Sequence, residues 1–416
     1  MSKKNRIVIT GLGTKNAIGS DVTQFAAALR QGICGISELD LFDTSEFLTH
    51  KGGQVKNFNP RRYIPGEFSL KRMSRADQLS FAATMEALTD AGLYPLPESI
   101  KEDTGVAIGG GSGGLFEAEN FYVELLSKGL DRSRFSRLST IYCASSADRI
   151  ASNLGLLGPK TTVMTACSAG ATALGFARDL ILNGQARLML AGGVEPMCRV
   201  TYAAFNALKS VDEDVCRPFA RNRAGLSLGE ASAILVLEPL EAALARGAKI
   251  YGEILGYGVT CDSFHMTSPD EKASGAVRSM QAALKDSGLA IEDIDYINAH
   301  GTATPVNDVT ETRAIKEVFG KRAYSIPVSS TKSMHAHTLG ASGALEGIVS
   351  LLALARGFIP PTIHCVECDP ECDLDYVTEG ARPADLRVVL SNSFAFGGNN
   401  TTVIFGKYEG QGVAHE

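Results

Sequence analysis

A short pattern that occurs in both halves of this chain limits the folds that it can adopt. Residues 87–93 read ALTDAGL and residues 283–289 read ALKDSGL, and each pattern closes an amphipathic segment before a glycine. A glycine just after the last helical position is a common way for a helix to end. Each predicted helix is followed by a short acidic connection and an apolar strand, at residues 105–108 and 296–299. The repetition predicts an internal duplication.

Two further pairs of segments support this duplication. The small-residue helix predicted at residues 169–184 matches one at 342–357, and the apolar strand at 7–13 matches one at 254–258. Helix ends use few residue types, so chance similarity is the alternative explanation.

The whole chain alternates strand-like apolar runs with helix-like segments, which predicts an α/β protein with mostly parallel sheets. Its 416 residues, 44% of them hydrophobic, exceed the usual size of one domain and can bury a large core. No Pro/Gly/Ser-rich linker interrupts the chain. We therefore expect two closely packed halves, residues 1–252 and 253–416.

Composition argues against several classes of protein. The net charge is −6 and the lysines and arginines are scattered, which disfavours nucleic-acid binding. Residues 1–6 are polar and lead directly into a strand, so no signal peptide is expected, and we expect no apolar run of membrane-spanning length. Nine cysteines without secretory features indicate reduced thiols in a cytoplasmic enzyme that does not act at a membrane.

Cys167 lies where a predicted strand, residues 161–166, meets a predicted helix, residues 168–183. The positive end of a helix and its unsatisfied N–H groups favour the thiolate form of such a cysteine. Small neighbours, Ala169 and Gly170 among them, allow the sharp turn that would direct the sulfur into a pocket. A buried structural cysteine is the alternative interpretation.

Two of the seven histidines lie in segments suited to chemistry. His300 follows an apolar strand that ends in a glycine turn, where α/β proteins usually expose functional side chains. His337 directly precedes a helix predicted to begin near Ala341. Either could instead be an ordinary satisfied polar group. With Cys167 they suit decarboxylative carbon–carbon bond formation, because neutral imidazoles stabilise an enolate beside a thioester without quenching the carbanion.

Two charged residues accompany His337 in the sequence. Lys332 would add positive charge close to this histidine, and Glu346 on the following helix could orient the lysine. The alternative for Glu346 is an ordinary intrahelical or surface carboxylate.

Two glycine-rich segments are candidate ligand loops. Residues 392–400 follow an apolar strand at 388–390, and glycines there let the backbone approach a ligand, so the N–H groups of Phe396 and Cys167 could form an oxyanion hole. A simple hairpin is the alternative. Residues 109–114 read GGGSGG but lack the Gly-Lys-Ser/Thr ending of a phosphate loop, so a strand-to-helix turn is expected.

Three motifs occur in one order: TACSAG at residues 165–170, HGTATP at 300–305 and STKS at 330–333. With them the chain resembles, over essentially its whole length, the ketosynthases of type II fatty acid and polyketide synthesis, and it is most similar to the elongating β-ketoacyl-acyl-carrier-protein synthase II group. The resemblance implies a thiolase-like duplicated five-layer α-β-α-β-α sandwich. Residues 1–252 would carry the nucleophile and residues 253–416 the histidine pair.

The resemblance also implies the reaction and its residues. An acyl group would move to Cys167, and decarboxylative Claisen condensation with malonyl-acyl-carrier protein (malonyl-ACP) would give a β-ketoacyl-ACP two carbons longer. His300 and His337 would be the decarboxylation pair, supported by Lys332. The remaining implied residues are the gating and oxyanion-hole Phe396 and the phosphopantetheine-binding Thr302 and Thr304.

No cofactor of the enzyme's own is implied, because the phosphopantetheine belongs to ACP. ACP is acidic, so its docking site should be basic. Lys71 and Arg72 lie where the family's docking bases fall, and Lys209 is a weaker candidate. A solvated helix face is the alternative for each. The partner subunit would be a second copy, or a chain-length-factor-like subunit for which this chain supplies the active site.

The sequence departs from the family at several positions. In the family a glycine usually precedes the second histidine, whereas residues 334–337 read MHAH, so His335 is an extra imidazole, and alignment on residues 339–341 favours His337. Ala395 and Asn399 replace common glycine and threonine residues, which could reshape the acyl entrance. Two segments, at residues 222–230 and 307–312, look more like ketosynthases of specialised polyene or polyketide pathways.

Three other interpretations remain. His364, Cys365, Cys368 and Cys372 form a weak candidate metal site, since no second cysteine pair matches, and we expect no metal. A degradative thiolase would share the fold but use a second cysteine as base. A catalytically silent chain-length factor would not need Cys167 and both histidines.

Overall fold

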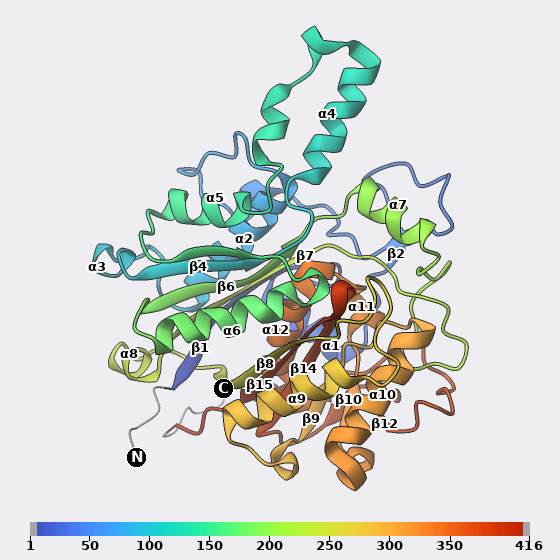
Figure 1. The fold of residues 1–416 in the computed structure, drawn as a ribbon. Coiled ribbons are helices and arrows are strands. Elements are labelled where there is room, and N and C mark those ends of the chain that lie inside the picture. Colours follow the sequence, from blue (N-terminus) through green and yellow to red (C-terminus); the bar gives the residue numbers. More distant parts are fainter. Residues whose placement is uncertain (1–5, 411–416) are drawn as a thin grey trace.

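The computed structural model describes residues 6–410, and eleven of its strands form one mixed sheet in the order β12-β10-β9-β14-β15-β8-β1-β7-β6-β4-β5 (Figure 1). The polar residues 1–5, which were part of the signal-peptide argument, lie outside this range. The strands of the first set are β1 (Ile7–Lys15), β4 (Thr104–Gly109), β5 (Lys160–Val163), β6 (Leu188–Glu195) and β7 (Ala231–Pro239). Those of the second are β8 (Gly252–Cys261), β9 (Tyr296–Asn298), β10 (Pro327–Ser329), β14 (Val388–Ala395) and β15 (Asn399–Gly406).

The two sets repeat one topology. In the first, β4 pairs in parallel with β5 and β6, while β7 pairs antiparallel with β6 and β1. In the second, β9 pairs in parallel with β10 and β14, while β15 pairs antiparallel with β14 and β8. The expectation of mostly parallel sheets is therefore wrong, because β7 and β15 run against both of their neighbours. The α/β class itself is confirmed.

The sets meet where β1 and β8 pair antiparallel, through Val8 opposite Glu253 and Ile9 opposite Gly252. The two segments are those that resembled one another in the sequence. β12 (Asp375–Tyr376) extends the second set beyond β10.

Helices cover the sheets in layers (Figure 1). Between the two sets lie α6 (Ala169–Leu182) and α12 (Ser342–Arg356), which contact each other and strands of both sets. On the outer faces lie α2 (Arg75–Asp90) and α5 (Ser145–Leu154) on one side, and α9 (Ser274–Ser287) and α10 (Pro305–Phe319) on the other. The result is the five-layer α-β-α-β-α arrangement of a thiolase-like fold.

The remaining elements are α1 (Val22–Gln31), α3 (Glu98–Lys101), α4 (Leu115–Lys128), α7 (Arg199–Ala207), α8 (Leu240–Ala245), α11 (Lys332–His335), β2 (Ser37–Glu38), β3 (Lys51–Gly52), β11 (Phe358–Ile359) and β13 (Arg382–Pro383).

The repeated helix ends are found where the sequence predicts them. Gly92 follows α2 with a φ of 67°, and Gly288 caps α9 with a φ of 73°. α2 also begins with a capping box, in which the Ser74 and Asp77 side chains each accept from the other's backbone N–H. Local sequence therefore specifies where α2 begins and where both helices end.

The segment Leu339–Arg356, which contains α12, is long and apolar enough to span a membrane, with a mean hydropathy of 1.3 over 18 residues. The expectation that no run reaches this length is wrong on that measure. However, 89% of the segment is buried, because α12 packs between two layers of sheet and needs apolar residues all round.

Candidate active site

Cys167 lies in a tight turn that links β5 to α6. The strand ends at Val163, three residues earlier than predicted, and a 3₁₀ turn, Ala166–Ser168, precedes the helix. Ala166 has a φ of 50°, a left-handed conformation that an extended strand does not allow. The turn places Cys167 inside the protein, with 6% of its surface exposed.

Close backbone packing holds this turn in place. A Cβ atom at Gly170 would lie 2.8 Å from the backbone nitrogen of Ala344 on α12, and one at Gly109 would lie 2.3 Å from the backbone carbon of Ala169. Only glycine allows α6 to approach both neighbours this closely. The glycine run at residues 109–114 is a strand-to-helix turn between β4 and α4, as predicted.

Cys167, His300 and His337 line one pocket of about 360 Å³. The imidazole rings lie 5.3 Å apart, centroid to centroid, at an angle of 84°. Thr302 and Thr304 line the same pocket. The structure thus brings together residues from segments that are widely separated in the sequence.

The backbone around His300 is held by a carboxylate that sequence reasoning did not identify. Glu311, buried on α10, accepts from the backbone N–H groups of His300 and Gly301, each at 2.8 Å, and from Asn392 Nδ2 at 3.2 Å. Burial raises the pKa of Glu311 to about 7. Phe394, also not identified from the sequence, packs against the His300 ring at 5.9 Å.

The hydrogen bonds of His337 select its tautomer. Its Nδ1 accepts from the backbone N–H of Leu339 at 3.3 Å and lies 2.9 Å from Ser342 Oγ. A ring nitrogen that accepts a backbone N–H carries no hydrogen, so the hydrogen of the neutral ring lies on Nε2. His337 therefore has one N–H donor left for a bound group.

Both histidines are neutral at neutral pH. Burial lowers the pKa of His300 and of His337 well below the usual range, and the ammonium of Lys332 lowers both further. His300 Nδ1 is also buried and has no hydrogen-bond partner among the described residues. This ring nitrogen is therefore not engaged by any described protein group.

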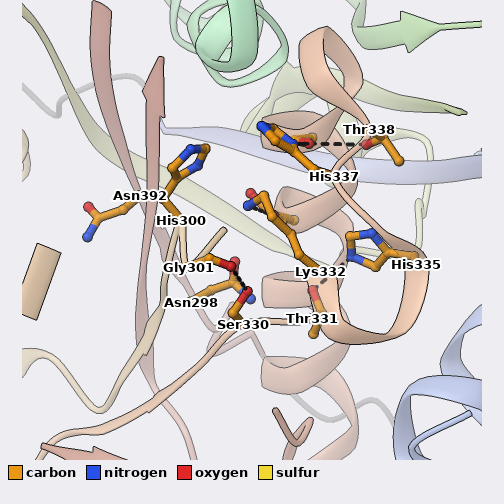
Figure 2. Close-up of polar contacts among 12 residues, drawn as sticks. Asn298, His300, Gly301, Ser330, Thr331, Lys332, His335, His337, Thr338 and Asn392 are labelled. Atoms are coloured by element: carbon orange, nitrogen blue, oxygen red, sulfur yellow. Dashed lines mark hydrogen bonds and ion pairs between the residues drawn. The ribbon is translucent and has the colours of Figure 1, made fainter. Parts of the chain in front are cut away.

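Lys332 and Glu346 form an ion pair that is wholly buried. The Lys332 side chain is drawn with His300 and His337 in Figure 2. The contact expected from the sequence is thus present, and Glu346 is not a surface carboxylate. Burial raises the pKa of Glu346 to about 7, while the neighbouring ammonium acts to lower it.

The prediction that the helix start and its N–H groups favour the thiolate form of Cys167 is wrong. Burial raises the pKa of Cys167 to about 12 and outweighs the groups that lower it, namely the Lys332 ammonium and the backbone N–H groups of Phe396 and Cys167. These groups nevertheless surround the sulfur, and they would stabilise negative charge that develops there.

His335 lies outside the pocket. Its Nδ1 is 2.8 Å from the Ala336 carbonyl oxygen, to which it donates, and its Nε2 is 2.9 Å from Thr331 Oγ1, from which it accepts (Figure 2). Its ring packs near Phe25, and burial lowers its pKa to about 3. The extra histidine is thus a satisfied core residue.

The glycine-rich segment after β14 is a hairpin turn, which was the alternative interpretation of the sequence. β14 continues to Ala395, five residues beyond the predicted strand, and pairs with β15 as a hairpin. The turn of this hairpin places the Phe396 N–H at the sulfur of Cys167. The Phe396 ring stacks on Phe205, with centroids 5.6 Å apart and planes at 15°.

Glu195 is a further buried carboxylate that sequence reasoning did not identify. It ends β6 and accepts from the backbone N–H groups of Gly111, Ser112 and Gly340, at 2.7 to 3.0 Å. It therefore ties the turn after β4 to the segment before α12. Its position at a strand end was the available signal, the same one that identified His300.

The candidate docking residues differ in their distance from the catalytic pocket. Lys71 and Arg72 are exposed in the turn before α2 and do not line the pocket, whereas Lys209 does. Within residues 6–410, no group of three or more His, Cys, Asp or Glu side chains is arranged to hold a metal ion.

Comparison with known proteins agrees with this geometry. The family model described as "Beta-ketoacyl synthase, N-terminal domain" matches residues 4–243, and that described as "Beta-ketoacyl synthase, C-terminal domain" matches residues 251–366. The 3-oxoacyl-[acyl-carrier-protein] synthase 2 of Synechocystis sp. (strain ATCC 27184 / PCC 6803 / Kazusa) is 44% identical over 414 residues, covering 98% of this chain and 99% of the relative.

Solved structures show the same similarity. "The ishigamide ketosynthase/chain length factor" has a TM-score of 0.93 at 39% identity and covers 97% of this chain and 100% of its own. A type II polyketide synthase acyl-carrier protein in complex with its ketosynthase, bound to the hexaketide, has a TM-score of 0.87 at 29% identity, over 98% and 100% of the two chains. This chain belongs to the β-ketoacyl synthase family and is an acyl-transferring condensing enzyme of the type II kind.

Proposed function

We propose that the protein condenses an acyl group held on Cys167 with the malonyl unit of malonyl-ACP, to give a β-ketoacyl-ACP two carbons longer. The observation that supports this most directly is the pocket itself, in which Cys167 lies with two neutral imidazoles. A general base would need a protonatable histidine, whereas an enolate is stabilised by neutral N–H donors.

In the first half-reaction, the sulfur of Cys167 attacks the thioester carbonyl of an acyl-ACP. The N–H groups of Cys167 and Phe396 stabilise the oxyanion, and the phosphopantetheine thiolate leaves and takes up the proton from Cys167. Lys332 assists because its charge lowers the pKa of the sulfur.

In the second half-reaction, the malonyl thioester carbonyl accepts from His337 Nε2–H and from His300. Carbon dioxide leaves, and the electron pair of the broken bond forms an enolate that these donors stabilise. The enolate carbon attacks the thioester on Cys167, whose thiolate is expelled and takes up a proton. No further cofactor is needed, because ACP carries the phosphopantetheine.

Thr302 and Thr304 are the proposed phosphopantetheine contacts. Their hydroxyls lie 3.0 Å apart on the wall of the pocket, directly after His300 in the chain. A phosphopantetheine that enters along this wall would bring its thioester to the imidazoles.

The active site would join two structural halves, residues 1–252 and 253–416. The repeated strand order supports this division. The first half would supply Cys167 and the second His300, Lys332, His337 and Phe396.

A partner subunit is also part of the proposal. α4 extends away from the sheets (Figure 1) and exposes Tyr122, Val123 and Leu126 to solvent. β5 pairs with β4 on one side, is the edge strand of the described sheet on the other, and is followed by the exposed Met164. A large exposed apolar surface and a free strand edge indicate an interface. The occupant that we propose is a second ketosynthase-fold chain, either another copy or a chain-length-factor-like subunit, as in the ishigamide ketosynthase/chain length factor.

ACP docking at Lys71 and Arg72, with Lys209 at the pocket, completes the proposal, and we place the enzyme in the cytoplasm. The solved complex of a ketosynthase with its ACP supports ACP as the partner. Reversal of charge at Lys71 and Arg72 should raise KM for acyl-ACP without changing kcat.

Intact-protein mass spectrometry tests the proposed chemistry. Wild type incubated with acyl-ACP should gain one acyl mass, and malonyl-ACP should then release carbon dioxide and a product two carbons longer. Cys167→Ala should gain no acyl mass, whereas Cys143→Ala, which removes a thiol outside the pocket lining, should behave as wild type. Acylation of Cys167→Ala to the wild-type extent would contradict the proposal.

A further inference from the structure

Two thiols face one another in a surface loop away from the catalytic pocket. Cys365 and Cys368, between β11 and β12, have their Sγ atoms 3.4 Å apart. Val366, between them, is fully exposed. A disulfide needs a sulfur–sulfur distance of roughly 2 Å, so a small movement of this exposed loop would suffice to form one.

The two thiols differ in a way that suits exchange chemistry. Cys365 is buried, with 7% of its surface exposed, whereas Cys368 is half-buried. The hydrogen bond from the Cys365 thiol lowers the pKa of Cys368, and the same bond together with burial raises that of Cys365. An accessible thiolate beside a second thiol is the arrangement of thiol–disulfide exchange sites.

We propose that Cys365 and Cys368 form a reversible disulfide, with a low-molecular-weight disulfide as oxidant. The Cys368 thiolate attacks one sulfur of the oxidant and releases the other as a thiolate, which leaves a mixed disulfide. Cys365 then loses its proton and attacks the Cys368 sulfur, which expels the second thiolate. Two electrons and two protons leave the pair, and the oxidant becomes two thiols.

The loop is joined to a segment that borders the catalytic pocket. Cys368 forms a backbone bridge with Ala220. The backbone N–H of Arg221 donates to the Glu367 carbonyl at 2.9 Å, and that of Asp369 donates to the Phe219 carbonyl at 2.8 Å. A movement of Cys368 is therefore transmitted to residues 219–221.

Arg223 continues the connection to the pocket wall. Its guanidinium donates to Asp369 at 2.6 Å and to the carbonyl oxygens of Thr304 and Pro305, at 3.3 and 2.8 Å. Thr304 and Pro305 both line the pocket. Oxidation should therefore change the binding of acyl-ACP, an effect that rests on the proposed function.

The disulfide is tested without reference to activity. The full chain is incubated with glutathione disulfide, alkylated and digested, and the peptide that contains Cys365 and Cys368 is weighed. In oxidised wild type this peptide should be lighter by two hydrogen atoms than the reduced peptide, and both thiols should resist alkylation. Treatment with dithiothreitol should restore the reduced mass and the alkylation of both thiols.

Serine variants identify the pair. Cys372→Ser should still form the disulfide, whereas Cys365→Ser should only form a mixed disulfide with glutathione at Cys368. Full alkylation of both cysteines after oxidation, or loss of the disulfide in Cys372→Ser, would overturn the proposal.

The effect on the pocket has a separate readout. KM for acyl-ACP in the acylation step should change by about fivefold on oxidation of wild type, at the lower end of typical coupling between sites. It should stay unchanged in the double variant Cys365→Ser/Cys368→Ser, which has neither thiol. If the disulfide forms without a change in KM, the proposed effect of the disulfide on the pocket is refuted, but the proposal of a reversible disulfide between Cys365 and Cys368 stands. If the enzyme is inactive in both the oxidised and the reduced state, the proposed function is refuted. The disulfide proposal is then still tested, because mass spectrometry detects the disulfide independently of activity.

Discussion

His335 and His337 are separated by one residue, and hydrogen bonding decides what each can do. His335 uses both ring nitrogens on the Ala336 carbonyl and the Thr331 hydroxyl. His337 uses only Nδ1 and keeps Nε2–H for the pocket. Two identical side chains thus have different chemistry, because a ring with both nitrogens engaged has nothing left for a substrate.

Glutamine substitution separates these two histidines. His337→Gln should lower the malonyl-ACP decarboxylation rate by about 100-fold or more, because the enolate loses a positioned donor. His335→Gln should leave that rate near wild type but lower the free energy of unfolding by about 1–3 kcal/mol, because a buried partner is left unsatisfied. Decarboxylation assays and urea unfolding of both variants check this, and equal rate losses would contradict it.

The protonation of the two pocket rings can be measured directly. A neutral imidazole persists down to its own pKa, and both pKa values lie well below the usual one. In NMR spectra, the ring resonances of His300 and His337, assigned with a glutamine variant of each, should not titrate from about pH 7.5 to about pH 5.5, whereas histidines of ordinary pKa titrate at about pH 6.5. The reaction rate cannot serve for this test, because burial raises the pKa of Glu311 and of Glu346 to about 7 and both carboxylates hold parts of the site. A ring titration centred at about pH 6.5 would refute neutral histidines with lowered pKa values.

At the scale of elements, the approach of α6 to α12 positions the nucleophile. Small residues line both helices, and Gly170 meets Ala344 and Gly340 at the crossing, one turn from Cys167. Side chains larger than glycine would separate the helices and displace the turn that holds Cys167.

Gly170→Ala tests this crossing. The added methyl would lie 2.8 Å from the Ala344 nitrogen, and we expect a loss of about 1–3 kcal/mol in the free energy of unfolding despite the better helix propensity of alanine. Gly66→Ala is the control, since no atom lies within 4 Å of its added Cβ and the change should stay below about 1 kcal/mol. Urea unfolding of both variants measures the difference, and an unchanged Gly170→Ala would show that the crossing tolerates more volume.

At the scale of the whole molecule, one group of exposed apolar residues lies on α4 and the segment after it. Leu126 is 86% exposed, and Leu130 and Phe135 are exposed nearby. These residues lie outside the hydrophobic core clusters of the single chain. They are the surface that the proposed partner subunit would cover.

Leu126→Glu should therefore weaken association. A carboxylate buried in an apolar interface without a partner is strongly unfavourable. In multi-angle light scattering, wild type, alone or with its partner subunit, should show about twice the 44.0 kDa of one chain, and Leu126→Glu should show one chain mass. Leu244→Glu, an exposed leucine on α8, should associate as wild type. Equal association of both variants would exclude α4 from the interface.

The sequence alone determined the α/β class, the helix ends at Gly92 and Gly288, and the segments that carry Cys167, His300 and His337. These features follow from local rules, because glycine ends helices and functional groups follow strand ends. The similar helices and strands also predicted the repeated topology, although not the antiparallel β7 and β15. Strand direction depends on pairing with distant segments, which local pattern does not encode.

Only the tertiary structure decided the environment of each group. Glu311 carries no signal in the sequence, and Glu195 carries only its position at a strand end. Both hold the site because the fold places their carboxylates against backbone N–H groups of other segments. The pKa of Cys167 is raised rather than lowered because burial outweighs the turn at the helix start. Desolvation and contacts between distant residues are properties of the packed chain, so no local pattern could have predicted them.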